Sequence, residues 1–316
     1  MDKSQETLIK EYTQRHQALK SVRSTYDPLW TDIRDFLAPR TAKLNGVMNS
    51  RVTREDLQII NSAPRFAVRT LPAGMQSGVT SPMRPWFRLG FADPELKKFK
   101  PAKEWISIVE DILREIFARS NFYDRRKSHY GVLGNYGTSP FFIEEDAQDL
   151  IRCFNFPIGA FCISTDSAGR VDTLYRETSF STRQMMQKFG DKVSSTVKEA
   201  FDKGNYETRH PVLHIIEPNR LYRPESALSQ FKKTASIWLD VTKQDAAAVL
   251  RISGYGFNPA LCPRWDVYGE DDYGVGCGEF AIGDAKQLQH MEKRKLQGID
   301  KNVNPPMLAD ASLRNQ

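Results

Sequence analysis

Two histidines four residues apart, His210 and His214, are the first candidates for metal chemistry in this sequence. This spacing places both rings on one face of a helix or of a strand, and Pro211 and the VLHII context favour a strand. A protein zinc site needs three or four ligands, and no third ligand lies nearby in the sequence. We therefore expect both histidines to be structural.

Acidic residues cluster twice, at 144–146 and at 271–272, where a cation could bind. Three successive acids in a strand point in different directions, and the second group lies beside a run of glycines. Solvated turns are the simpler interpretation of both clusters.

The glycine run GVGCG at 274–278 has the composition of a phosphate-binding loop but not its spacing. It matches neither the dinucleotide fingerprint nor GxxxxGK(S/T), and the sequence also lacks HExxH and GxSxG. We interpret the run as a flexible turn into a helix. The sequence therefore predicts no catalytic residues, no metal site and no cofactor, and a protein that is not an enzyme.

Basic residues near the C-terminal end could contact nucleic-acid phosphate; the candidates are Lys286, Lys293, Arg294 and Lys295. On a helix the last three spread around most of the circumference, and neighbouring acids dilute their charge. A solvated face, or a face that bridges subunits, is the alternative interpretation.

The composition indicates a globular protein with a modest basic excess. Hydrophobic residues make up 40% and charged residues 27% of the 316 residues, and the net charge is +6. Residues 41–100 hold ten Lys or Arg against four Asp or Glu, a surface that could meet phosphate. No apolar run of about 18 residues exists, so no membrane partner is expected. The four cysteines form no CxxC, which favours a reduced protein.

Helical patterns dominate the first part of the chain. We predict helices over 3–25, from an N-cap at Asp27 to about Pro39, over 103–119 and over 121–136. Residues 40–54 have no period and are predicted to form a mobile loop. Helical character resumes over 55–78, with interruptions at Pro64 and Pro72.

Strand patterns follow from Pro140 onward. They include a hairpin with its turn at 166–169, and the strands VLHII, SIWLDV and AVLRIS. A short helix with a capping box at Ser181 and Gln184 lies between the hairpin and these strands, and a second short helix ends near Gly204.

The longest predicted helix follows the glycine run and ends at the proline pair 305–306. Its apolar residues recur at steps of three and four: Ala281, Ala285, Leu288, Leu296, Ile299 and Val303. About 25 residues span roughly 35–40 Å. A rod of that length with one apolar stripe needs neighbours to cover it.

A proline-rich arm, SPMRPWFRLG, carries further apolar residues that belong either to the core or to a contact with another copy. Together with the stripe, this arm gives the candidate subunit interface: Trp86, Phe87, Leu288, Leu296 and Ile299.

Short motifs follow one another in a definite order over most of the chain. They are the Trp30 region, LPAGMQSGVTSPMRPWFRLG, GVLGNYGT, RET followed by a helix ending KFG, then SGY, PRW, GE, YG, EKRKLQ and VNPPML. In this order they resemble the head-to-tail connecting (portal) proteins of short-tailed bacteriophages. Pro72 departs from the alanine that the family pattern has there.

The resemblance implies a portal-like α+β fold with N-terminal helices, a β-rich middle body and a long stem-type helix. Residues 1–139 would form a helical wing-like region with the aromatic arm. Residues 140–277 would form a mixed wing and clip, and residues 278–316 a stem-like helix with a truncated tail.

The resemblance also implies a structural role without catalysis. About twelve copies would form a closed ring at one capsid vertex, with heterologous contacts between neighbours. Double-stranded DNA would pass through the ring during packaging and ejection, and Lys286 and the basic run at 293–295 would line its channel. Capsid, terminase and tail adaptor proteins would be the partners. The protein would belong to the virion after assembly in the cytoplasm of a bacterial host.

Two other interpretations stay open at this point. One is a DNA-processing enzyme of the same packaging machinery, and the other is a monomeric binding module whose aromatic arm packs internally. Members of the family are longer than this chain, so we also expect a truncated or split copy, such as a non-functional prophage fragment, whose ring forms poorly.

Overall fold

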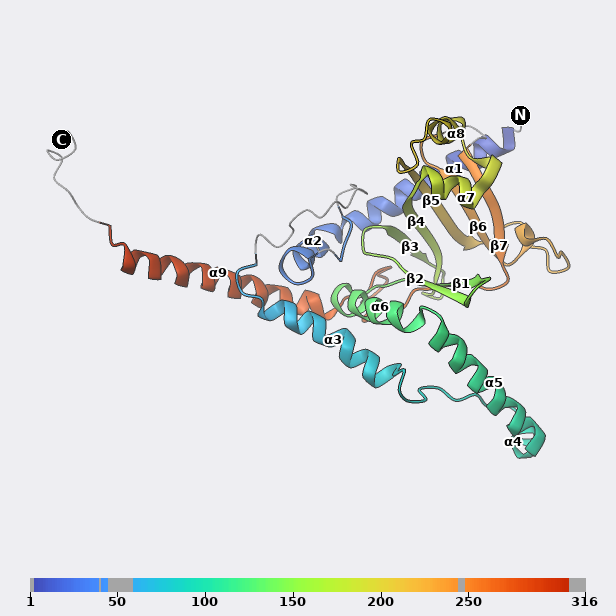
Figure 1. The fold of residues 1–316 in the computed structure, drawn as a ribbon, viewed down its shortest axis with the longest axis horizontal. Coiled ribbons are helices and arrows are strands. Elements are labelled where there is room, and N and C mark those ends of the chain that lie inside the picture. Colours follow the sequence, from blue (N-terminus) through green and yellow to red (C-terminus); the bar gives the residue numbers. More distant parts are fainter. Residues whose placement is uncertain (1–2, 40, 45–58, 244–247, 307–316) are drawn as a thin grey trace.

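The computed structural model describes residues 3–39, 41–44, 59–243 and 248–306. They form an α+β fold in which two antiparallel sheets are flanked by helices, and a long helix extends from the body (Figure 1). The predicted fold class is confirmed. The loop predicted over 40–54 lies mostly outside the described residues, as does the start of the helical segment predicted from 55. No described helix is both long enough and apolar enough to cross a membrane.

The described helices occur mainly where the periodicity predicts them. They are α1 (Lys3–Ser24), α2 (Asp27–Phe36), α3 (Ala63–Val79), α4 (Pro94–Lys98), α5 (Lys100–Arg119), α6 (Phe122–Tyr136), α7 (Thr182–Phe189), α8 (Ser195–Asp202) and α9 (Cys277–Val303), with short 3₁₀ turns η1 (Gly190–Lys192) and η2 (Ser229–Phe231).

Two details of the helix prediction are wrong. Asp27 is the first residue of α2 rather than its cap, and its carboxylate lies 3.6 Å from Nε of Arg23. Pro72 lies inside α3, which continues past it to Val79. The side chain of Pro72 is buried and packs near Gly131 of α6. This packing offsets the free-energy cost of the backbone hydrogen bond that a proline removes. The capping box of α7 is confirmed.

The five-stranded sheet has the order β3-β4-β5-β6-β7, and every neighbouring pair is antiparallel. Its strands are β3 (Phe161–Thr165), β4 (Val171–Ser181), β5 (Arg209–Pro218), β6 (Thr234–Asp240) and β7 (Val249–Tyr255). The smaller sheet has the order β2-β1-β8, from β1 (Phe141–Asp146), β2 (Leu150–Asn155) and β8 (Ala260–Leu261).

Helix α1 is fixed to the large sheet by polar contacts that span the chain. Nη1 of Arg15 lies 2.7 Å from the buried carboxylate of Glu217, which also accepts a hydrogen bond from the Tyr175 hydroxyl at 3.0 Å. Arg23 donates to the carbonyl oxygen of Gly159 at 2.9 Å. Burial would penalise the Glu217 carboxylate unless it were paired and hydrogen-bonded in this way.

One hydrophobic cluster contains residues that are far apart in the sequence, among them Trp30, Tyr136, Phe142, Tyr273 and Ala285. It therefore joins α2, α6, the smaller sheet and α9. The division of the chain at 139 and 277 stays a prediction, and residues 307–316 lie outside the described part of the chain.

His129 on α6 is fully buried, and neither of its ring nitrogens has a hydrogen-bond partner among the described residues. Burial, with a smaller contribution from the charge of Arg126, lowers the pKa of His129 to about 3. The unfolded chain binds this proton near pH 6.5, whereas the folded chain does not bind it until about pH 3. Burial of the neutral His129 imidazole therefore leaves the free energy of unfolding unchanged above pH 6.5. This free energy decreases as the pH falls from 6.5 toward 3, because only the unfolded chain takes up the proton.

We predict that the free energy of unfolding decreases between pH 7 and pH 5, by up to about 2 kcal/mol through His129 alone. The variant His129→Phe should lose less stability over that interval, because it has no proton to take up on unfolding. Urea unfolding at several pH values measures this difference. His290→Phe, at an exposed position of α9, is the control and should keep the parent's loss. Parallel curves for parent and His129→Phe would contradict the prediction.

Candidate functional site

The end of α6 and the start of α9 meet at a contact between two backbone segments, both rich in glycine. Gly137 ends α6 in the left-handed region with φ +79°, and its carbonyl oxygen accepts a hydrogen bond from the Trp265 amide at 2.8 Å. The Gly274 amide donates to Oγ1 of Thr138 at 2.7 Å. A Cβ atom on Gly276 would lie 2.5 Å from the amide nitrogen of Gly137, and one on Gly278 would overlap the carbonyl oxygen of Asn135.

This glycine joint corrects the interpretation of GVGCG. The turn into a helix is confirmed, but the glycines are present because two backbones approach too closely for any side chain. Glycine spacing alone does not distinguish a free turn from a close contact. The joint fixes where α9 begins and in which direction it leaves the body.

The first half of α9 is attached to the body beyond the joint. Ala285 is buried in the main hydrophobic cluster. The Gln289 side chain is also buried: its Oε1 accepts from the amides of Ile60 and Asn61 at 2.7 and 2.8 Å, and its Nε2 donates to the Asn61 carbonyl at 2.8 Å. These bonds hold the segment that leads into α3 against α9.

The second half of α9 extends away from the body (Figure 1). Leu296 lies 11 residues after Ala285, and Val303 lies 18 residues after Ala285. These separations are about three and five full helical turns, so all three residues lie on one face. Leu296 is 54% exposed and Val303 70%. The predicted stripe is therefore covered only near the middle of α9, at Ala285 and Leu288. Ala281 before this part and Ile299 beyond it are exposed.

The candidate basic residues have different surroundings. Nζ of Lys286 lies 2.6 Å from the carboxylate of Asp32 on α2, so this lysine is paired within the chain. Lys293, Arg294 and Lys295 are exposed, and Arg294 contacts Gln297 at 3.4 Å. A role of these residues in facing DNA stays a prediction.

Comparison with known proteins identifies the family. The family model described as bacteriophage head to tail connecting protein matches residues 9–316. The chain belongs to that family. It is 40% identical over 313 residues to the portal protein of Salmonella phage epsilon15, covering 98% of this chain and 55% of that protein. It is 36% identical over 314 residues to the probable portal protein of Bordetella phage BPP-1, covering 99% of this chain and 56% of that protein.

The family resemblance inferred from motif order is thus confirmed. The chain spans about half the length of the curated relatives it matches. In this connector-family chain the glycine joint brings together two of the motifs that carry the resemblance, GNYG at 134–137 and YG at 273–274.

The aromatic arm packs largely against its own chain. The Trp86 ring stacks on Phe122 at a centroid distance of 5.9 Å, and its Nε1 donates to the Tyr123 hydroxyl at 3.1 Å. Phe87 lies edge-on to Phe117 at 5.9 Å. Both side chains remain half-exposed. Participation of Trp86 and Phe87 in a subunit interface stays a prediction.

Helix α5 presents an exposed apolar surface that sequence reasoning missed. Trp105 is 59% exposed, and Ile108 and Ile112 are also exposed. A signal was available in the apolar doublets at 105–106, 108–109, 112–113 and 116–117, which make two adjacent stripes. One stripe packs against the body and the other is exposed to solvent. The apolar face of α5 is therefore wider than a single packing contact requires.

The predicted structural histidines lie on β5 and are hydrogen-bonded. Nε2 of His214 lies 3.0 Å from Oγ of Ser236, and its ring stacks on Trp238 with centroids 3.7 Å apart. Nε2 of His210 lies 3.0 Å from Oγ1 of Thr182. Within the described ranges, no three His, Cys, Asp or Glu side chains converge on a point where a metal could bind.

We predict that Gly276→Ala lowers the free energy of unfolding by about 1–3 kcal/mol, because its Cβ meets backbone that cannot move aside. Gly283→Ala is the matched control on α9: a Cβ there meets nothing within 4 Å. It should be neutral or stabilise the protein by up to about 1 kcal/mol. Urea unfolding measures both variants, and equal effects would show that the joint does not constrain the fold.

Proposed function

We propose that this chain is a structural subunit of a phage portal, the head-to-tail connector, which forms a ring at one capsid vertex. The observation that carries the proposal is α9, whose apolar stripe is covered by the body around Ala285 and continues well beyond it. Membership of the connector family and the portal names of two relatives support the same role.

A ring requires two different surfaces on each subunit, because neighbours meet head to tail. The described residues provide two exposed apolar surfaces, one on the second half of α9 and one on α5. Both helices extend from the body in Figure 1. Large exposed apolar patches on a protein mark contact sites. We infer a closed ring of about twelve copies, in which the second half of α9 is covered by adjacent copies.

The charge on α9 suits a passage for duplex DNA. Its second half carries four basic residues, Lys293, Arg294, Lys295 and Lys301, against the acids Glu292 and Asp300. Strong phosphate binding would oppose sliding, whereas a mixed surface with a small basic excess attracts DNA without holding it. The chain would guide DNA in packaging and ejection and would not itself be an enzyme.

The remaining assignments follow from this role. The N-terminal helices would belong to a wing, the sheets to wing and clip, and α9 to a stem. Capsid, terminase and tail adaptor proteins would be the partners of the ring. It would assemble in the cytoplasm of the bacterial host and remain in the virion.

Assembly tests the proposal directly. Purified protein should form closed particles, seen by electron microscopy and native mass measurement, with an opening wide enough for duplex DNA to pass. A compact monomer at all concentrations would refute it.

We predict that the double variant Leu296→Asp, Ile299→Asp raises the concentration needed for assembly by about ten-fold or more, because the stripe then carries charge into an apolar contact. Unfolding of the monomer should change little, since both side chains are exposed. Gln287→Asp with Asn302→Asp adds the same charge off the stripe and should assemble as the parent does. Analytical ultracentrifugation compares them, and equal assembly of both double variants would argue against the stripe as an interface.

A further inference from the structure

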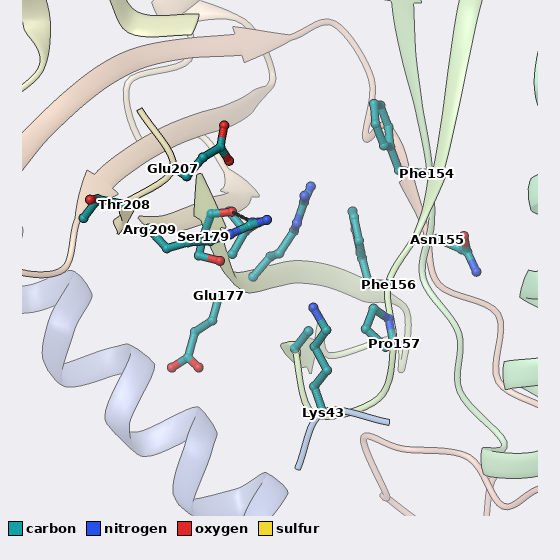
Figure 2. Close-up of a pocket in the computed structure, with 13 residues that line it drawn as sticks. Lys43, Phe154, Asn155, Phe156, Pro157, Glu177, Ser179, Glu207, Thr208 and Arg209 are labelled. Carbon is teal, nitrogen blue, oxygen red and sulfur yellow. Dashed lines mark hydrogen bonds between the residues drawn. The ribbon is translucent and has the colours of Figure 1, made fainter. Parts of the chain in front are cut away.

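A cleft of about 1070 Å³ lies beside β4, near the point where β3 begins. Its walls include the apolar side chains of Phe154, Phe156 and Pro157 and three cationic side chains, Lys43, Arg176 and Arg209. In Figure 2, Lys43 reaches into the cleft from below, and Arg209 crosses toward Ser179.

The chain's own acids compensate the positive charge of this cleft only in part. The Arg176 guanidinium lies over the Phe156 ring, 4.1 Å from its centroid, and Arg209 donates to the Ser179 carbonyl at 3.3 Å. Within the described part of the chain, none of the three cations forms an ion pair. Burial lowers the pKa of Arg176 to about 10 against the opposing charge of Glu144, and this leaves the guanidinium charged near neutral pH.

One of the two acids that line the cleft is paired outside it. Glu177 points away from the cleft toward α1 (Figure 2), where Nζ of Lys20 lies 3.0 Å from its carboxylate. Glu207 also lines the cleft and is exposed. The cleft therefore keeps a net positive charge beside apolar walls, which suits an anionic polypeptide segment better than a bare anion.

One exposed segment of the same chain has the complementary chemistry. The acidic loop at 266–272 carries four carboxylates in seven residues, together with Tyr268, which is 57% exposed. Asp272 accepts a hydrogen bond from Oγ1 of Thr165 at 2.8 Å, whereas Asp266 and Glu270 are exposed.

The cleft and the acidic loop lie at opposite ends of the hairpin formed by β3 and β4. The cleft is lined by Ala160 and Arg176 at one end. The loop contacts the other end, where Arg264 donates to the Gly169 carbonyl and Asp272 accepts from Thr165. The five residues of β3 separate them by about 17 Å, so the loop lies away from the cleft of its own chain.

We propose that the acidic loop of one copy docks in the cleft of the next copy. This contact rests on the proposed ring, and it is heterologous, as a ring requires. Asp266 and Glu270 would pair with Lys43 and Arg209 at the rim, while Tyr268 packs among the aromatic walls and a carboxylate approaches Arg176.

Charge reversal and its rescue test the contact. The cleft variant is Lys43→Glu with Arg209→Glu, and the loop variant is Asp266→Lys with Glu270→Lys; all four positions are exposed, so folding should be unaffected. Each variant alone should need about ten-fold more protein to assemble, because like charges then face each other. A 1:1 mixture of the two should assemble as the parent does, since alternating copies restore every opposite-charge contact.

The control for added negative charge is Lys192→Glu with Lys198→Glu, near α8 and outside the cleft. This double variant should assemble normally.

Mass photometry separates the possible results. Loss of assembly in each variant and recovery in the mixture would establish the contact. If each variant alone assembles normally, or if assembly is lost and the mixture does not restore it, the docking contact is wrong. Neither result contradicts the proposed ring. A parent that stays monomeric would overturn the proposed function as well. If a fluorescent single-stranded oligonucleotide binds the parent but not the cleft variant, and assembly is unaffected, the cleft binds phosphate and the docking proposal is wrong.

Discussion

The arrangement of this molecule depends on one close contact, the glycine joint between the end of α6 and the start of α9. Two backbone segments more than 130 residues apart in sequence touch there without intervening side chains. The hydrogen bonds across the joint fix both its spacing and its orientation. Because a helix is stiff over its length, the orientation at its first turn determines where its last turn lies, about 40 Å away.

The joint also explains why α9 has two environments. Ala285 and Gln289 lie close enough to the joint to reach α2 and the segment before α3, and they complete the core. Beyond them the same face continues in Leu296 and Val303 with no body beneath it. An apolar stripe that extends beyond its own core is the physical basis of the proposal that the rest of α9 contacts other copies.

Charged residues of the large sheet also differ in whether they have a partner within the chain. On the α1 side, Glu217 is matched by Arg15 and by Tyr175, so its burial is compensated. At the base of the hairpin, Arg176 lies over an aromatic ring and forms no ion pair among the described residues, although the charge of Glu144 acts on it. Assembly between copies would remove this imbalance together with the exposed apolar surface, so both features point to the same conclusion about the molecule.

Local patterns in the sequence determined the types of the elements and most of their limits. The helical stripe of α9, the hairpin turn at 166–169 and the capping box of α7 each depend on residues only a few positions apart, and the structure contains all three. Motif order was also sufficient for the family. The tertiary structure alone decided that the glycines at 274–278 form a contact, that Trp86 stacks on Phe122, and that Lys286 pairs with Asp32. It also decided which part of the α9 stripe is covered. These outcomes depend on the distances between residues far apart in the chain, which no periodicity or spacing in the sequence encodes.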